Sequence, residues 1–139
     1  MDLMISVTQG RNLPARHIGS SGGATSDSFV TVLLGAEEIG RTTVVNGSLN
    51  PVWGCNFTTK ISDADLEKHL VFKVWDKESF EDGPMGEVRI GLHKKIPEKD
   101  KMWAVKDEKN ENAGHLQIKI IIQKAGRKPS STGFWECCR

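Results

Sequence analysis

The sequence has almost no net charge and no long apolar segment. Its 19 basic and 18 acidic side chains give a formal net charge of +1. No global field therefore attracts the chain to nucleic acid, and electrostatic binding would need a local patch. No segment approaches the roughly 20 apolar residues of a transmembrane helix. Residues 1–5 lack the basic and apolar regions of a secretory signal, so we expect a cytoplasmic location.

Motifs for enzymatic chemistry and zinc binding are also missing. The three cysteines, Cys55, Cys137 and Cys138, do not have zinc-ligand spacing. The chain contains no Gly-x-Ser-x-Gly, no His-Glu-x-x-His and no phosphate-binding loop. The four histidines have no nucleophile at a recognisable spacing. We therefore expect neither catalysis nor a small-molecule substrate.

Period-two alternation dominates the remaining sequence. The odd-numbered positions from Trp53 to Thr59 fall on one face, as in a half-buried strand. Both Trp53 and Trp75 lie in such segments and are expected in the core. A chain of 139 residues with this pattern is typical of one all-β domain, an eight-stranded antiparallel β-sandwich. The expected strands are 3–7, 28–34, 39–45, 53–61, 70–75, 86–92, 102–106 and 115–123.

Three segments depart from this pattern. Residues 17–26 contain five consecutive Gly and Ser residues, which predict a mobile loop without regular structure. Ser62 is expected to cap a helical turn, because its side-chain oxygen can accept a hydrogen bond from a free amide. Residues 124–139 are polar and contain Pro, Ser and Gly, so we expect a flexible tail after a domain of residues 1–123.

Three signatures at strand–loop junctions resemble those of the C2 domain family. They are Ser26-Asp27-Ser28-Phe29-Val30, Leu49-Asn50-Pro51-Val52-Trp53, and Val74-Trp75-Asp76-Lys77-Glu78 followed by Met85-Gly86-Glu87. The resemblance covers residues 3–122. It implies a β-sandwich whose loops at one end bind calcium and membrane lipid or a protein partner. The complete strand at 115–123 is similar to the second, phospholipase-type topology of the family.

The resemblance implies a calcium site that this chain keeps only in part. Calcium takes six to eight oxygen ligands, usually from several carboxylates. Asp27 and Asp76 match aspartates of the family, and Glu78 stands at a third position as a longer carboxylate. The position of a fourth holds Gly83, with Asp82 one residue early. We therefore expect calcium binding to be weak or absent.

The remaining ligand position of the family's calcium site also predicts weak or absent calcium binding. Arg16 and His17 stand where the resemblance places the first aspartate, and a basic residue there repels a cation. In the alternative to metal binding, Asp76 and Asp82 orient turns at the rim. Asp27 would then accept hydrogen bonds from loop amides and fix the entry to the second strand, which is the alternative we favour for it.

Apolar and basic side chains near the loops are candidates for membrane contact. Ile18 and Phe80 match loop tips that insert between lipid headgroups in membrane-docking C2 domains, and burying both would contribute about 3–5 kcal/mol. Phe80 could instead fold back as a lid on the core. Lys94 and Lys95 begin the densest basic group, where each residue would add about 1 kcal/mol near an anionic leaflet. The alternative for this group is a solvated rim.

These observations favour a non-enzymatic module that is cytoplasmic and peripheral to membranes. It would dock to phospholipid, with calcium dependence weak or absent. The alternative is a protein–protein interaction module that has lost lipid and calcium binding, which the long Gly/Ser loop and the missing first aspartate favour. The apolar tips and the lysines favour the membrane.

Overall fold

Nearly all regular structure in the described part of the chain is β. The computed structural model describes residues 1–15, 17–18, 24–77, 83–93 and 100–123. Its strands are β1 (Asp2–Arg11), β2 (His17–Ile18), β3 (Ala24–Thr25), β4 (Ser28–Leu34), β5 (Glu37–Arg41), β6 (Val52–Lys60), β7 (His69–Asp76), β8 (Gly83–Gly91), β9 (Lys101–Lys106) and β10 (Asn112–Gln123). One short 3-10 helix, η1 (Asp63–Glu67), precedes β7. No helix among these residues is long and apolar enough to cross a bilayer.

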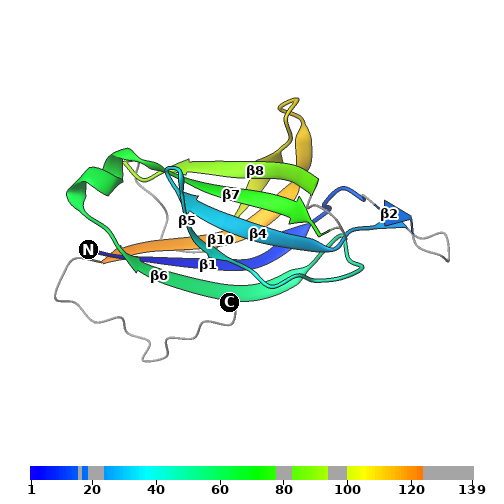
Figure 1. The fold of residues 1–139 in the computed structure, drawn as a ribbon, viewed down its shortest axis with the longest axis horizontal. Coiled ribbons are helices and arrows are strands. Elements are labelled where there is room, and N and C mark those ends of the chain that lie inside the picture. Colours follow the sequence, from blue (N-terminus) through cyan, green and yellow to red (C-terminus); the bar gives the residue numbers. More distant parts are fainter. Residues whose placement is uncertain (16, 19–23, 78–82, 94–99, 124–139) are drawn as a thin grey trace.

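The eight longer strands form one antiparallel sheet that folds over on itself. Their order is β5-β4-β7-β8-β9-β10-β1-β6. Figure 1 shows β4, β7 and β8 in one layer and β10, β1 and β6 in the other. The two outermost strands, β5 and β6, are in contact, so the sandwich is close to a closed barrel. The prediction of an all-β, eight-stranded antiparallel sandwich is confirmed.

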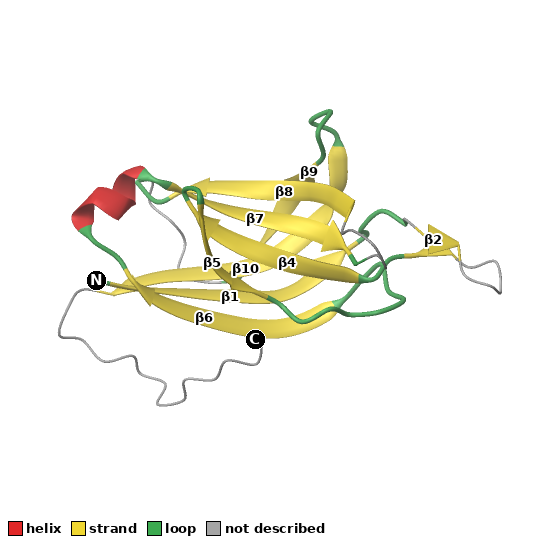
Figure 2. Cartoon of the chain, in the orientation of Figure 1, coloured by secondary structure: helices red, strands yellow, loops and turns green. Residues whose placement is uncertain are grey.

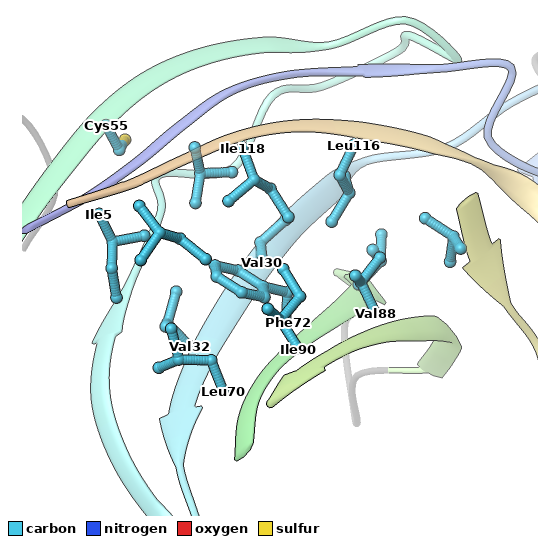
Figure 3. Close-up of a cluster of buried hydrophobic side chains, with 14 of the residues drawn as sticks. Ile5, Val30, Val32, Cys55, Leu70, Phe72, Val88, Ile90, Leu116 and Ile118 are labelled. Carbon is cyan, nitrogen blue, oxygen red and sulfur yellow. The ribbon is translucent and has the colours of Figure 1, made fainter. Parts of the chain in front are cut away.

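The core lies between the two layers and follows the alternation of the sequence. Phe72 of β7 is completely buried and faces side chains from β1 and β10 (Figure 3). Trp53 and Cys55 of β6 are buried as expected, whereas Val52 and Gly54, which alternate with them, are exposed. The cluster includes Leu3, Ile5, Val7, Val30, Val32, Trp53, Cys55, Leu70, Phe72, Val74, Val88, Ile90, Val105, Leu116, Ile118 and Ile120.

The third expected strand differs from the structure. Its β-branched residues predict a strand at 39–45, but β5 ends at Arg41. The Thr42 side chain takes the place of a backbone carbonyl, because its Oγ1 accepts the hydrogen bond of the Val30 N–H (2.9 Å). An isolated bridge between Ser28 and Val45 continues the pairing beyond this point. A threonine that competes with the backbone thus ends the ladder early.

The segment 17–26 also differs from its prediction. We expect no regular structure there, but β2 and β3 pair, with His17 opposite Thr25 and Ile18 opposite Ala24. This short hairpin projects from the body of the sandwich (Figure 2). Backbone hydrogen bonding between two such short strands does not require alternating apolar residues, so the sequence pattern does not predict this pairing. Residues 19–23 lie outside the described part of the chain.

Two smaller expectations concern the ends of elements. Ser62 is the N-cap residue of η1, as predicted, but the capping hydrogen bond runs from the Ser62 backbone N–H to Asp65 Oδ2 (2.9 Å). The domain boundary after residue 123 stays a prediction, because residues 124–139 lie outside the described residues.

The packing predicts the effect of truncating the core. Phe72→Ala should lower the free energy of unfolding by about 3–5 kcal/mol, because it removes buried surface and leaves a cavity between the layers. Val52→Thr is a matched control, since Val52 is 66% exposed and the change keeps a β-branched shape. It should shift stability by less than about 0.5 kcal/mol. Urea unfolding of both variants measures this, and equal losses would contradict the assigned core.

Candidate functional site

Three connections meet at one end of the sandwich, which we call the loop end. They follow β1, β5 and β7, and the ladder places Ser28 opposite Asp76 and Asp76 opposite Gly83. In Figure 1 this is the end from which the β2–β3 hairpin projects, whereas η1 lies at the opposite, far end. The loop end therefore brings together the three signatures that the sequence separates by about twenty residues each.

The second signature ties two of these connections to each other. The Gly10 N–H donates to the Pro51 carbonyl (2.8 Å). The Asn12 N–H donates to Asn50 Oδ1 (2.9 Å). The Trp53 indole N–H donates to the Ser28 carbonyl (3.1 Å), so this core residue also anchors the start of β4. Sequence reasoning identified the motif but not these contacts, which alternation does not encode.

Asp76 and Asp27 link the connections through their carboxylates. Asp76 is completely buried, and its Oδ1 accepts from the Asp27 N–H (2.9 Å). Asp27 Oδ1 accepts in turn from the Gly47 N–H (2.7 Å), and the Asp27 carbonyl accepts from the Lys77 N–H (2.7 Å). These are contacts of a carboxylate that organises loop amides. They leave fewer lone pairs for a cation, and the role of both residues as calcium ligands stays a prediction.

The described residues do not by themselves fit a calcium ion. Among them, no three His, Cys, Asp or Glu side chains gather as a metal site. Gly83 is the ladder partner of Asp76, so a carboxylate at position 83 would have stood beside it. Glu78 and Asp82, the other two candidate ligands, lie outside the described residues, as does Arg16.

The described elements next to the membrane-contact candidates lie at different ends of the sandwich. Ile18 lies in β2 at the loop end, and Phe80 belongs to the connection from Asp76 to Gly83 at the same end. Lys94 and Lys95 follow β8, which ends at the far end, where Gly91 pairs with His69. Phe80, Lys94 and Lys95 themselves lie outside the described residues, so their roles stay predictions.

Trp75 does not lie in the core, contrary to expectation. It stacks on Phe29 with ring centroids 6.4 Å apart, and its indole N–H donates to Thr31 Oγ1 (2.9 Å). Arg41 covers the other aromatic ring, 5.8 Å from the centroid of Phe29. This cluster lies on the outer face of β4 and β7. The alternation that buries Val74 already carried the signal, because neighbouring residues of a strand face opposite sides.

A groove of about 1110 Å³ lies next to this cluster, along β7, β8 and β9. Trp75 and Trp103 contribute aromatic surface to it. Its charged lining is balanced, with Lys73, Arg89, Lys106 and Lys109 against Glu87, Asp107, Glu108 and Glu111. Arg89 is paired with Glu87 (2.7 Å), and Asp107 Oδ1 accepts from the backbone of the hairpin that it opens. The groove is therefore amphipathic rather than basic.

The carboxylate network predicts a structural role for Asp76. Asp76→Ala should lower the free energy of unfolding by about 1–3 kcal/mol, since it leaves the Asp27 amide without its buried acceptor. Glu108→Ala removes an exposed carboxylate from the turn between β9 and β10 and should change stability by less than about 0.5 kcal/mol. Thermal unfolding without added calcium compares the two, and an unchanged Asp76→Ala midpoint would show that the network does not hold the loops.

Comparisons with known proteins agree with this geometry. A C2 domain family model matches residues 1–120. The chain is 39% identical over 93 residues to Protein C2-DOMAIN ABA-RELATED 11 of Arabidopsis thaliana, covering 65% of this chain and 50% of that protein. It is 31% identical over 129 residues to a C2 and GRAM domain-containing protein of the same plant, covering 92% of this chain and 11% of that protein.

A solved structure shows the same fold. A C2 domain of plant Extended Synaptotagmin 1 superposes with a TM-score of 0.70 at 23% identity, covering 86% of this chain and 91% of that chain. At this identity the likeness speaks for the fold alone. The family model nevertheless spans nearly the whole described sandwich, from β1 to residue 120 in β10. The chain belongs to the C2 domain family.

Proposed function

We propose that the chain is a non-enzymatic C2 module that docks to phospholipid membranes through its loop end and is peripheral to them. The observation that carries the proposal is the common origin of two connections. The β2–β3 hairpin, which contains Ile18, and the β7–β8 connection, which contains Phe80, leave the sandwich at the same end. Two apolar residues on neighbouring loops are suited to enter the headgroup region together, and membership of the C2 family supports this role.

We further propose that calcium binds weakly or not at all at Asp27, Asp76, Glu78 and Asp82. One oxygen each of Asp27 and Asp76 already accepts a backbone N–H. A calcium ion would have to compete with these hydrogen bonds and lacks a carboxylate at position 83. The placement of β1 between β10 and β6 supports the second, phospholipase-type topology.

A second candidate function rests on the groove. Its two tryptophans and its balanced charges have the composition of a protein interface, where aromatic residues are enriched and like charges are diluted. In this alternative, the sandwich binds a protein partner with the outer face of β7 and β8. Lys94 and Lys95 would then be a solvated rim rather than a lipid contact.

The proposed calcium site predicts a low affinity. Calorimetric titration should give a dissociation constant no tighter than high micromolar, because the described carboxylates are engaged and other ligand positions hold basic residues or glycine. Gly83→Asp is the informative variant, since it would place a carboxylate opposite Asp76 and should strengthen binding. Low-micromolar affinity at two sites in the parent chain would contradict the proposal.

Vesicle binding separates the two proposed functions. Phe80→Ala should weaken co-sedimentation with anionic vesicles in chelator and leave the melting temperature nearly unchanged. If Phe80 is a lid on the core, the same variant should instead lose about 3 kcal/mol or more of stability. Lys94→Glu with Lys95→Glu tests the other end of the sandwich: a loss larger than that of Asp76→Asn, with a steep salt dependence, would mean that surface charge at the far end contributes to docking, in addition to or in place of the loop end.

The vesicle experiment distinguishes membrane docking from protein binding. No co-sedimentation at low salt, with or without calcium, would reject the membrane proposal and leave the groove as the functional surface. Arg89→Glu lies in the groove and serves as the control, because it should leave vesicle binding unchanged if the loop end docks.

A further inference from the structure

Two histidines at the far end of the sandwich face a common space. His69 is the first residue of β7, and His93 follows β8 by two residues. Their rings lie edge to face, with centroids 5.9 Å apart. Both side chains are exposed. Neither residue contributes to the loop end or to the groove, so the pair is independent of the proposed function.

The glycine between them defines the space. A Cβ built on Gly91 would lie 3.1 Å from His93 Nδ1 and 3.5 Å from His69 Nε2. One nitrogen of each ring therefore borders the position that a side chain at residue 91 would fill. The atom nearest this position is His93 Cε1, at 2.8 Å, so the absence of a side chain at Gly91 is what lets the His93 ring lie over it, with one nitrogen of each ring at its border.

The backbones that carry the two rings are fixed to each other. Gly91 is the ladder partner of His69. The Leu92 N–H donates to the Lys68 carbonyl (3.1 Å), and the Gly35 N–H donates to the His69 carbonyl (2.9 Å). The residues next to both histidines are thus held by main-chain hydrogen bonds. An ion that binds both rings would cost the protein little backbone entropy, because only the side chains need to rotate.

The lysine that precedes His69 does not oppose a metal ion strongly. The Nζ of Lys68 is paired with Asp65 Oδ1 (2.8 Å). The lysine charge is therefore balanced by a carboxylate on η1 and directed toward it.

We propose that His69 and His93 form a two-imidazole site for a divalent transition metal such as Cu²⁺, Zn²⁺ or Ni²⁺. Imidazole nitrogen is a preferred ligand for these ions, with Cu²⁺ favoured in the Irving–Williams order. Metal–nitrogen bonds of about 2.0–2.1 Å require ring centroids roughly 5 Å apart, so a small rotation of the two exposed rings suffices. Water completes the coordination. Calcium takes oxygen ligands, so this pair of imidazole nitrogens does not select it.

Copper spectroscopy tests the site directly. After alkylation of accessible thiols, one equivalent of Cu²⁺ should give an electron paramagnetic resonance spectrum with coupling to two imidazole nitrogens. His69→Gln or His93→Gln should leave one nitrogen and weaken Cu²⁺ and Zn²⁺ binding at least roughly 10-fold, since loss of a residue that only supports a ligand already costs that much. His115→Gln, in β10, is the matched control and should change neither the spectrum nor the affinity.

A variant that keeps both ligands makes the test sharper. Gly91→Ala places a methyl group 2.8 Å from His93 Cε1, so the ring must turn away while the fold retains its ladder. It should weaken metal binding without removing a nitrogen from the chain. Coupling to a single nitrogen in the parent, an affinity unchanged in His69→Gln, or binding only at millimolar metal would each overturn the proposal.

Discussion

A buried carboxylate organises the end of the sandwich on which the proposed function depends. Asp76 ends β7 without any exposed surface, and it holds the Asp27 amide at the start of β4. Asp27 passes the connection on to Gly47 in the loop after β5. Burying a carboxylate is costly unless it is hydrogen-bonded, so Asp76 needs the Asp27 amide as a partner. The hydrogen bonds of this relay therefore fix three loops relative to one another. The same hydrogen bonds use oxygens that a calcium ion would need.

The relay gives a physical reason why this C2 fold would persist if calcium binds weakly or not at all, as we propose. Where a metal ion bridges the loops, it supplies cohesion that the loops themselves lack. In this chain, backbone amides supply part of that cohesion, and the contacts of Trp53 with Ser28 and of Asn50 with Asn12 add to it. The described residues of the loop end are therefore held together by hydrogen bonds within the protein, which supports our proposal that docking does not need a cation.

The fold could be predicted from the sequence almost completely, because burial on one face of a strand leaves a period of two. The period gives the inward positions of β6 and β7, whereas β4, which is buried on both faces, has no such alternation and follows from its nearly continuous apolar run. The prediction was wrong where a side chain replaces the ladder, as Thr42 does for Val30. It was also wrong for Trp75, whose size suggested the core although its position beside Val74 places it on the outer face.

The candidate site could be predicted only as a set of residues. Motif spacing placed Asp27 and Asp76 at one end, but it carried no information on which amides their oxygens accept. Residues that are brought together by pairing across strands could not be predicted as neighbours. His69 and Gly91 are ladder partners separated by 22 residues in the sequence, and no local pattern connects them or His93. Since the sandwich brings such residues together at both ends, the two ends differ in donor chemistry: carboxylate oxygen at the loop end and imidazole nitrogen at the far end. Under our two proposals, the far end would hold a borderline transition metal through imidazole nitrogen, whereas the loop-end oxygens, already engaged by backbone amides, would hold calcium weakly or not at all.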